Sequence, residues 1–213
     1  MARGNPIFAW VYKRLAAALE RAGGDEHRRR LLAGLDGRVL EVGAGHGINF
    51  PYYPDTVTEV VAVEPEPRLR ADAERAARDA PVDVTVLDGT AERLPVEADG
   101  FDAAVVSLVL CSVDDPPTAA AELARVVRPG GQLRVYEHVR SQQPGQARWQ
   151  DRFDVLWPHL AGGCHTGRDT LATLRRAGFE VEEEDRFTFP PSRVFVPTSP
   201  HLLARAHRSP EHG

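Results

Sequence analysis

The sequence is poor in lysine and methionine, with one residue of each type, Lys13 and Met1. Arginine therefore supplies nearly all of the 26 basic side chains. Glycine and proline are abundant, with 18 and 17 residues. This composition is typical of GC-rich coding sequences, so we expect a bacterial source.

Cysteine is also scarce, since Cys111 and Cys164 are the two present and lie far apart in the chain. Two distant cysteines argue against a disulfide framework, and no Cys/His spacing resembles a zinc motif, so we expect no metal. Cys111 lies within an apolar run and is interpreted as a small core residue. Cys164 lies in the segment 162–168, where we expect a structural or substrate-shaping role.

Long apolar runs and excess positive charge are absent too. No stretch of eighteen apolar residues is present, and the N-terminus lacks the pattern of a signal peptide. The formal net charge is -5, and no basic stretch is interleaved with aromatic residues, which argues against a nucleic-acid partner. We therefore expect a cytoplasmic protein without integral membrane association. The sequence carries no signature of an oligomeric state.

What the sequence does contain is an alternation of apolar strands and helices. Such alternation predicts a doubly wound parallel sheet. Near the N-terminus, residues 6–19 form one apolar helical face, and Asp25 is expected to cap a helix over 27–32. The expected strands are 38–42, 59–64, 82–87, 101–113 and 132–138, with helices at 68–79 and 116–128.

The last third of the chain has a looser pattern. An aromatic helix is expected over Trp149, Phe153, Leu156, Trp157 and Leu160. Thr166 and Asp169 predict the capped start of a helix that ends near Gly178. Two further strands are expected near 179–187 and 202–207.

A glycine-rich segment, Glu41-Val42-Gly43-Ala44-Gly45-His46-Gly47, directly follows the first strand. Glycines at that turn let the backbone bend sharply and approach a ligand closely. The dinucleotide fingerprint requires its third glycine at the position where this chain has Ile48. The carboxylate of Glu41 would also repel a pyrophosphate and attract an ammonium group. The segment therefore disfavours a nicotinamide oxidoreductase.

Two further acids follow along the chain. Glu64 ends the second expected strand, and Asp88 follows the third. The carboxyl ends of parallel strands form the ligand-binding edge of such sheets. One carboxylate there can accept hydrogen bonds from both ribose hydroxyls, and the other can accept from the exocyclic amine of an adenine. Each acid alone would be a solvated strand end, but the ordered set indicates a nucleoside site.

The motifs EVGAGHG, VAVEP, LDGTAERLP, FDAAVVSLVLCSV and RVVRPGG resemble those of class I S-adenosylmethionine-dependent methyltransferases of the quinone-biosynthesis type. The resemblance implies S-adenosylmethionine as cofactor. It also implies an α/β fold with a Rossmann-like doubly wound sheet, mostly parallel with an antiparallel C-terminal strand, and helices on both faces. The implied cofactor contacts are Glu41, Gly43, Ala44, Gly45, Gly47, Asn49, Glu64, Pro65, Asp88, Gly89, Thr90, Ser107 and Leu108.

Within that set, the resemblance places Glu41 and the glycines at the methionine end of the cofactor and Glu64 at the ribose. Asp88 is expected at the adenine, and Ser107 with Leu108 at the sulfonium. Other segments resemble the methyltransferase-like alkyl-thiol methyltransferases of animals, namely residues 49–54, 108–113, 137–139 and 157–170. Those relatives carry an N-terminal membrane anchor, which is not carried over to this chain because the hydrophobic run is missing.

His138, at the end of the fifth expected strand, is the candidate catalytic residue. A neutral imidazole there could take a proton from a thiol or hydroxyl acceptor, whereas the alternative is a histidine bonded structurally in its loop. Phe8, Trp10 and Tyr12, with the aromatic helix, are expected to roof an apolar pocket for a small-molecule acceptor. The residues leave a thiol, a hydroxyl and a ring carbon open as acceptors.

We expect a single domain over 1–213, since no linker interrupts the chain. It comprises N-terminal lid helices (1–35), a cofactor-binding core (36–140) and an acceptor side (141–213). The alternative function is a non-catalytic sensor or partner-binding protein that binds S-adenosylmethionine without transferring its methyl group.

Overall fold

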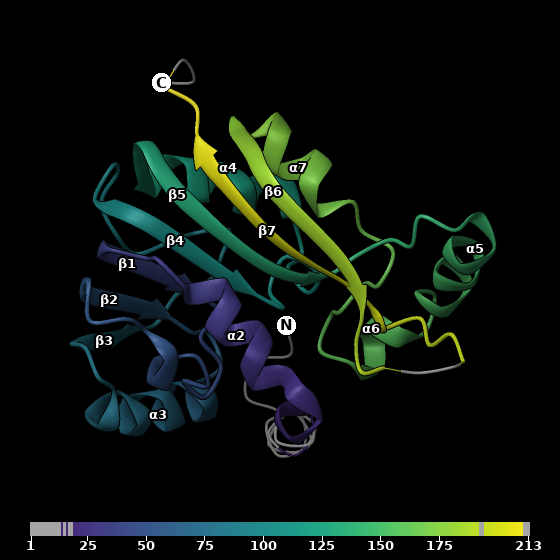
Figure 1. Ribbon diagram of the computed structural model, residues 1–213, viewed down its shortest axis with the longest axis horizontal. Helices are drawn as coiled ribbons and strands as arrows, with labels where there is room; N and C mark the ends of the chain where they lie inside the picture. Colours follow the sequence, from purple (N-terminus) through teal and green to yellow (C-terminus); the bar gives the residue numbers. More distant parts are fainter. Residues whose placement is uncertain (1–13, 15, 17–18, 192–193, 211–213) are drawn as a thin grey trace.

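One seven-stranded sheet forms the centre of the computed structural model, which describes residues 14, 16, 19–191 and 194–210 (Figure 1). The strand order is β3-β2-β1-β4-β5-β7-β6. Strands β1 to β5 pair in parallel, and β7 is antiparallel to both of its neighbours. The predicted mostly parallel sheet with an antiparallel C-terminal strand is confirmed. The strands are β1 (Gly37–Val42), β2 (Val57–Val63), β3 (Val84–Leu87), β4 (Phe101–Ser107), β5 (Val127–His138), β6 (Phe179–Thr188) and β7 (Pro200–Arg208).

Helices cover both faces of the sheet, as the resemblance implied. Helices α2 and α3 share one apolar cluster with the sheet, and α4 and α7 share the other. Helices α5 and α6 project beyond the carboxyl ends of the parallel strands (Figure 1). Within the described residues, no helix is both long and apolar enough to cross a membrane. The α-helices are α2 (Asp25–Leu32), α3 (Pro67–Ala76), α4 (Pro116–Val126), α5 (Pro144–Phe153), α6 (Trp157–Leu160) and α7 (Thr170–Arg176).

Shorter helical segments flank these elements. They are a π-helical turn, η1 (Glu20–Gly24), and two 3-10 turns, η2 (Phe50–Tyr52) and η3 (Ala77–Asp79). Most of the predicted helix over 6–19, together with Phe8, Trp10 and Tyr12, lies outside the described residues.

The central strands are apolar on both faces because helices cover the sheet on both sides. Successive side chains of a strand point to opposite faces. Accordingly Val39 and Val105 lie in one core cluster, whereas Leu40 and Val106 lie in the other, and all four are fully buried or nearly so. The carboxyl ends of these rigid strands position the residues of the site.

The predicted strand over 101–113 is too long. Strand β4 ends at Ser107, and Leu108 turns the chain with a positive φ of 59°. The amides of Val109 and Leu110 then donate to the side-chain carboxylate of Glu137 on β5 instead of to the backbone of a neighbouring strand. An apolar run does not by itself distinguish a buried strand from a buried turn.

The predicted single aromatic helix is two helices, because the chain breaks between α5 and α6. Asp154 lies in the break, and its carboxylate accepts hydrogen bonds from the amides of Thr166 and Gly167. A carboxylate held by a distant loop fixes the end of α5, and the periodicity of the aromatic residues gives no sign of that contact.

Two predicted helix caps are also wrong. Asp25 lies inside α2, where it accepts from Arg29, and the position before the helix is Gly24. Helix α7 is capped by Asp169 alone, which accepts from the amide of Ala172 at 3.1 Å. The hydroxyl of Thr166 donates to Asp154 instead. The helix expected to reach residue 128 ends earlier, since β5 already begins at residue 127.

Candidate active site

A cavity of about 400 Å³ opens at the carboxyl ends of the parallel strands. This is the edge at which open α/β sheets bind ligands. Four predicted cofactor residues, Gly43, Pro65, Gly89 and Thr90, line it. The complete lining consists of Val42, Gly43, Val63, Pro65, Gly89, Thr90, Ala91, Glu92, Val109, Val113 and Asp114.

The glycine loop after β1 requires glycine for two reasons. Gly43, Gly45 and Gly47 have φ values of 69°, 59° and 80°, a region that side chains disfavour. A Cβ atom on Gly43 would also lie 2.5 Å from Cγ2 of Val109 across the cavity wall. The loop therefore brings bare backbone to the cavity, and a side chain at Gly43 would fill the space.

Glu64 ties the glycine loop to the end of β2. Its buried carboxylate accepts hydrogen bonds from the amide of Gly45 at 2.8 Å and from that of Glu66 at 2.9 Å. Burial raises the pKa of Glu64 to about 7, although both amides oppose this shift. Its contact with a ribose remains a prediction, but its carboxylate lies beside the predicted loop.

Glu41 is buried beneath the same loop. Asn49 donates to its Oε1 at 2.8 Å, and the hydroxyl of Tyr53 donates to its Oε2 at 2.7 Å. Burial raises the pKa of Glu41 to about 7 against these two hydrogen bonds. A cation bound nearby would favour the ionised carboxylate, as expected for the ammonium of a methionine group.

Arg28, on α2, belongs to this network and was missed from the sequence. Its Nη1 donates to Oδ1 of Asn49 at 2.7 Å and to the hydroxyl of Ser107 at 3.3 Å. Its Nε donates to Glu20 at 2.8 Å. Arg28 is followed by two further arginines, but it alone lies three and four residues before Leu31 and Leu32, a spacing that places it on their buried face of the helix.

Asp88 lies differently from Glu41 and Glu64. Its side chain is 68% exposed and accepts a hydrogen bond from Arg70 at 3.0 Å. Like Glu41 and Glu64, it is not a lining residue of the cavity, whereas the next two residues, Gly89 and Thr90, are. Its contact with an adenine stays a prediction, and the structure gives this acid a weaker position than the sequence suggested.

Glu137, the residue before His138, organises the turn that follows β4. Its fully buried carboxylate accepts from the amides of Val109 and Leu110 at 2.8 Å and from that of Cys111 at 3.1 Å. Burial raises the pKa of Glu137, and the three amides oppose this. One side chain thus fixes a wall residue of the cavity, Val109, and a neighbouring thiol.

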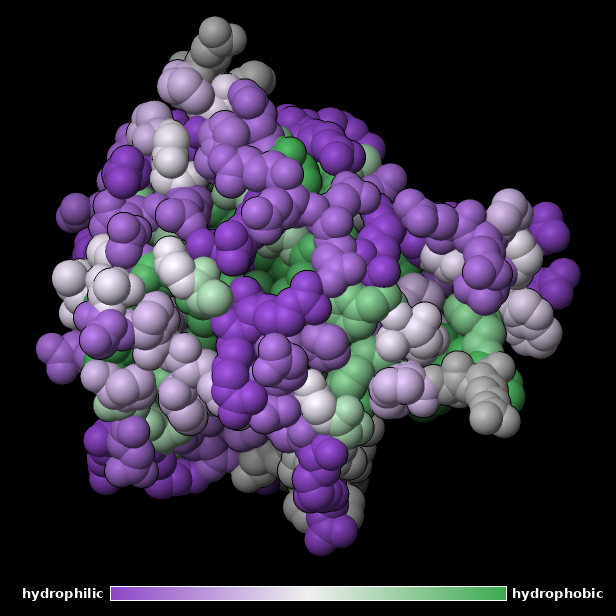
Figure 2. Space-filling view, viewed as in Figure 1, coloured by the Kyte–Doolittle hydropathy of each residue, from purple (hydrophilic) through white to green (hydrophobic). Residues whose placement is uncertain are grey.

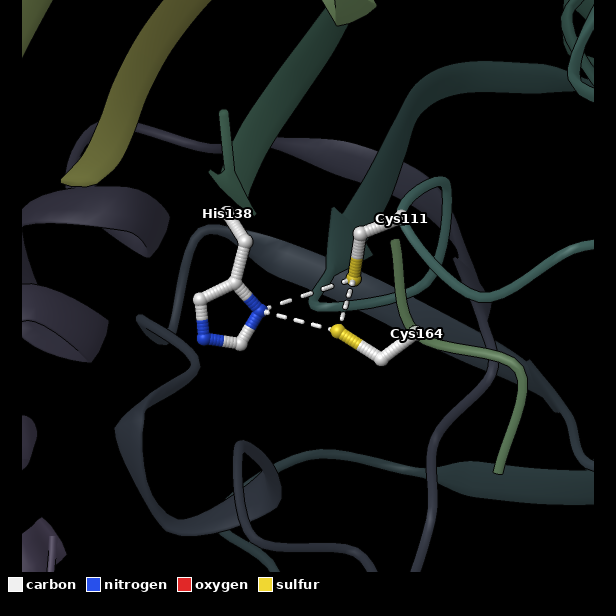
Figure 3. A group of neighbouring side chains, drawn as sticks. All are labelled: Cys111, His138 and Cys164. Carbon is white, nitrogen blue, oxygen red and sulfur yellow. Dashed lines mark hydrogen bonds between the residues drawn. The ribbon is translucent and has the colours of Figure 1, made fainter. Parts of the chain in front are cut away.

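His138 meets both cysteines of the chain at the end of β5 (Figure 3). Its Nδ1 lies 3.7 Å from Sγ of Cys111 and 3.5 Å from Sγ of Cys164, and the two sulfurs are 3.8 Å apart. The cysteines are free thiols. The hydrogen bond between them, and then His138, lower the pKa of Cys164, whereas the same bond and burial raise that of Cys111.

The loop carrying Cys164 is fixed against the turn carrying Cys111. The amide of His165 donates to the carbonyl oxygen of Cys111 at 2.7 Å. A Cβ on Gly163, whose φ is 89°, would lie 2.7 Å from the carbonyl oxygen of Ser112, so this approach requires glycine. Cys111 is buried, as predicted for a core residue, and its thiol also faces His138 and Cys164. General-base catalysis by His138 stays a prediction.

Exposed apolar side chains surround the acceptor side. Figure 2 shows apolar surface on the projection that carries α5 and α6. Trp149, expected in the roof of a pocket, is 61% exposed, whereas Phe153 and Trp157 stack with ring centroids 4.8 Å apart. Among the residues that the structure describes, the large exposed apolar ones are Trp149, Val155, Leu156, Leu160, Val194 and Val196.

These features fit S-adenosylmethionine. The space before Gly43 admits a ligand against bare backbone, and a buried carboxylate lies on either side of the glycine loop, at Glu41 and Glu64. The resemblance predicts the ammonium of the methionine group beside the first carboxylate and the ribose hydroxyls beside the second, and both contacts stay predictions. The acceptor would then approach from the side of His138.

Comparison with known proteins agrees with this assignment. A family model described as a methyltransferase domain matches residues 40–135. Human thiol S-methyltransferase TMT1B is 34% identical over 182 residues, covering 82% of this chain and 73% of that protein. A solved S-adenosylmethionine-dependent methyltransferase from Thermotoga maritima has a TM-score of 0.70 at 23% identity, covering 95% of this chain and 98% of the other.

The fold alone does not fix the chemistry. The [4+2]-cyclase SpnF has a TM-score of 0.70 at 20% identity, covering 87% of this chain and 80% of that one. The family model and the human relative carry the assignment instead. The chain belongs to the class I S-adenosylmethionine-dependent methyltransferases, which transfer a methyl group from this cofactor, here to a small acceptor.

Proposed function

We propose that this enzyme methylates the sulfur of a small, apolar thiol. The supporting observation is the extent of its similarity to a named thiol S-methyltransferase. That similarity runs over 182 residues, whereas the methyltransferase domain model spans residues 40–135. The alignment must therefore include much of the chain outside the cofactor core, where the acceptor is expected to bind.

The residues of the cofactor edge, formed by the glycine loop and the ends of β1 and β2, orient the reacting groups. S-adenosylmethionine supplies, when bound, a methyl group already activated on a sulfonium. The glycine loop, Glu41 and Glu64 hold the cofactor in one position, and the turn after β4 supplies Val109 to the cavity wall. Holding two reactants in line accounts for much of the rate of such a displacement.

The acceptor must lose a proton, because the thiolate is the strong nucleophile and free thiols are mostly protonated at neutral pH. His138 lies beside the two buried thiols of Cys111 and Cys164. These three residues, with the projection of α5 and α6, form the acceptor edge. We therefore place the acceptor sulfur near His138. Exposed apolar residues around α5 and α6 fit an acceptor with an apolar substituent.

Pairs of acceptors that differ in one atom test the proposal. We expect release of S-adenosylhomocysteine and an S-methyl product with an alkyl thiol and with thiophenol, measured by mass spectrometry. The matched alcohol and phenol should react at least tenfold more slowly, since a hydroxyl is far less acidic than a thiol. Methylation of phenol but not of thiophenol would overturn the proposal. Cofactor binding without turnover of any acceptor would favour the alternative function, a non-catalytic protein that binds S-adenosylmethionine.

Calorimetry provides an independent control of the cofactor assignment. S-adenosylhomocysteine should bind, and NAD should not, because the glycine spacing and Glu41 disfavour a pyrophosphate. Tighter binding of NAD would contradict it.

We further propose a cytoplasmic location in a bacterial cell, a single domain over 1–213 and no nucleic-acid partner. The net charge of -5 supports the last of these. Cell fractionation and a nucleic-acid binding assay at low salt test them.

A further inference from the structure

Cys111, His138 and Cys164 come from three separate segments, yet their polar atoms point at one another (Figure 3). Cys111 belongs to the turn after β4, His138 ends β5, and Cys164 lies in the loop after α6. Each offers one atom that can bind a metal ion, and these atoms all lie within 4.8 Å of one another. The sequence separations of 26 and 27 residues from His138 match no zinc motif.

The three separations match the edges of a tetrahedral zinc site. Zinc lies about 2.3 Å from thiolate sulfur and about 2.0–2.1 Å from imidazole nitrogen, so tetrahedral angles place two sulfurs about 3.8 Å apart and sulfur about 3.6 Å from nitrogen. The observed distances are 3.8 Å between the sulfurs and 3.5 and 3.7 Å from Nδ1. One ion could therefore contact all three atoms with little movement.

The backbone holds these ligands in place. Glu137 fixes the amide of Cys111, and the amide of His165 binds the carbonyl of the same residue. Gly163 allows the close approach of the two loops. Preorganised ligand positions of this kind are expected for a metal site, in which surrounding hydrogen bonds orient the residues that bind the ion.

Charge and softness favour zinc among divalent ions. Two thiolates and a neutral imidazole balance the charge of the ion, and thiolate ligands select zinc over magnesium or calcium. Arg168 donates to the carbonyl oxygen of Leu110, the residue before Cys111, at 2.6 Å. The nearby guanidinium of Arg168 would offset the negative charge of a third sulfur ligand, such as an acceptor thiolate.

We propose that Cys111, His138 and Cys164 bind one zinc ion whose fourth position receives the acceptor thiol. Zinc sites with three protein ligands and an open fourth position are catalytic, whereas four-ligand sites are structural. The inference rests on the proposed thiol acceptor. It replaces general-base catalysis by His138, because an Nδ1 that binds zinc cannot also take the acceptor's proton.

The reaction balances without an oxidant or reductant. The acceptor thiol binds as a thiolate and gives its proton to solvent. A sulfur lone pair then forms the new carbon–sulfur bond, while the electron pair of the broken sulfonium bond remains on the departing thioether. The neutral methylated product binds zinc weakly and leaves, which restores the open position.

Metal binding is tested without turnover. The purified enzyme should contain about one zinc per chain by mass spectrometry, and cobalt(II) added to the metal-free protein should give the absorption of a tetrahedral thiolate complex. Cys111→Ser, Cys164→Ser and His138→Gln should each weaken cobalt binding about 100-fold or more. His159→Ala, an exposed histidine on α6, is the matched control and should bind as wild type does.

The fourth position has its own spectroscopic readout. In the presence of S-adenosylhomocysteine, an alkyl thiol should shift the cobalt–thiolate absorption, and the matched alcohol should not. Calorimetry with S-adenosylhomocysteine checks that each variant remains folded, and the wild-type titration alone decides the proposal if one does not.

Two results would overturn the zinc site. The first is a wild-type protein that gives no tetrahedral cobalt spectrum. The second is a metal-free protein that methylates thiols at the full rate. Failure of the thiol assignment is distinct, because a protein that binds zinc but methylates only phenols keeps the metal site and loses the proposed function.

Discussion

The cofactor edge, formed by the glycine loop and the ends of β1 and β2, differs from the acceptor edge, formed by His138, the two cysteines and the projection of α5 and α6. Short segments build the cofactor edge, because each glycine and acid lies within a few residues of a strand end. Distant segments build the acceptor edge, where Cys111 and Cys164 meet although 53 residues separate them. A change at one edge should therefore leave the other largely intact.

The largest expected effect is at Gly43. Gly43→Ala should weaken S-adenosylhomocysteine binding about 100-fold or more, because the new Cβ crowds Val109 in the cavity wall and overpacking of this kind costs about 1–3 kcal/mol beyond the backbone strain. Gly34 is the matched control, since its φ of 71° is similar and nothing lies within 4 Å of its Cβ position. Gly34→Ala should lose stability but keep its cofactor affinity.

Glu64 and Asp88 give the next comparison, within the cofactor edge itself. Glu64→Ala should weaken cofactor binding by about 2–3 kcal/mol, since a charged acceptor for two hydroxyls is lost. Asp88→Ala should cost less than about 1 kcal/mol, because its exposed carboxylate is paired with Arg70. Calorimetry of both variants decides, and a larger loss at Asp88 would mean that the adenine binds outside the cavity.

Replacement of Gln150 should disturb the acceptor edge without affecting the cofactor edge. Its buried Nε2 lies 3.1, 2.9 and 3.0 Å from the carbonyl oxygens of Val139, Thr166 and Pro197. Gln150→Leu should lower the free energy of unfolding by about 2 kcal/mol, since buried carbonyls lose their donor. The KM for the acceptor should rise several-fold while cofactor affinity stays constant. Exposed Gln142→Leu is the control, and an equal loss of cofactor affinity would contradict the separation of the two edges.

The last expected effect is a pH dependence to which the buried carboxyls of the cofactor edge contribute. The pKa values of Glu41 and Glu64 are raised from 4.5 to about 7 in the folded protein, so these groups hold protons in the native state that they lose on unfolding. Their contribution to stability is therefore present below pH 4.5 and is lost as pH rises through about 7. Chemical denaturation of the cofactor-free protein at several pH values measures this fall.

Cofactor binding should show the opposite trend. An ammonium beside Glu41 and hydroxyls beside Glu64 favour the ionised carboxylates, so binding should tighten by about tenfold per carboxyl between pH 6 and pH 8. Calorimetry in two buffers of different ionisation enthalpy counts the protons released. Glu41→Gln should remove part of the trend, and an unchanged trend would assign it to other groups.

Much of the cofactor edge could be predicted from sequence because its requirements are local. A positive φ or a close backbone approach demands glycine at Gly43, and a strand end places Pro65 or Gly89 at the cavity. The alternation of strands and helices likewise predicted a mostly parallel sheet, whereas the strand order comes from the structure. Leu108 marks the limit, since the apolar run over 101–113 continues through the turn without a change in composition.

The acceptor edge could not be predicted in this way. Glu137 acts through buried hydrogen bonds to residues more than twenty positions away, and Arg28, which belongs to the cofactor edge, was missed for the same reason. The thiol–imidazole cluster depends on the sheet order that sets β4 beside β5, and on a loop returning after α6. Spacing rules for zinc ligands describe adjacent turns of one motif, so they overlook ligands that only tertiary structure brings together.

The turn after β4 works as a fixed spacer between donor and acceptor. One residue, Leu110, separates Val109, at the cavity wall, from Cys111, and the two peptide units that join them span at most about 7 Å. Because Glu137 holds both amides at once, backbone geometry rather than side-chain rotation sets how far the two sites stand apart. Such a spacer tolerates wide variation in the acceptor's outer substituent, but not the insertion of a single residue.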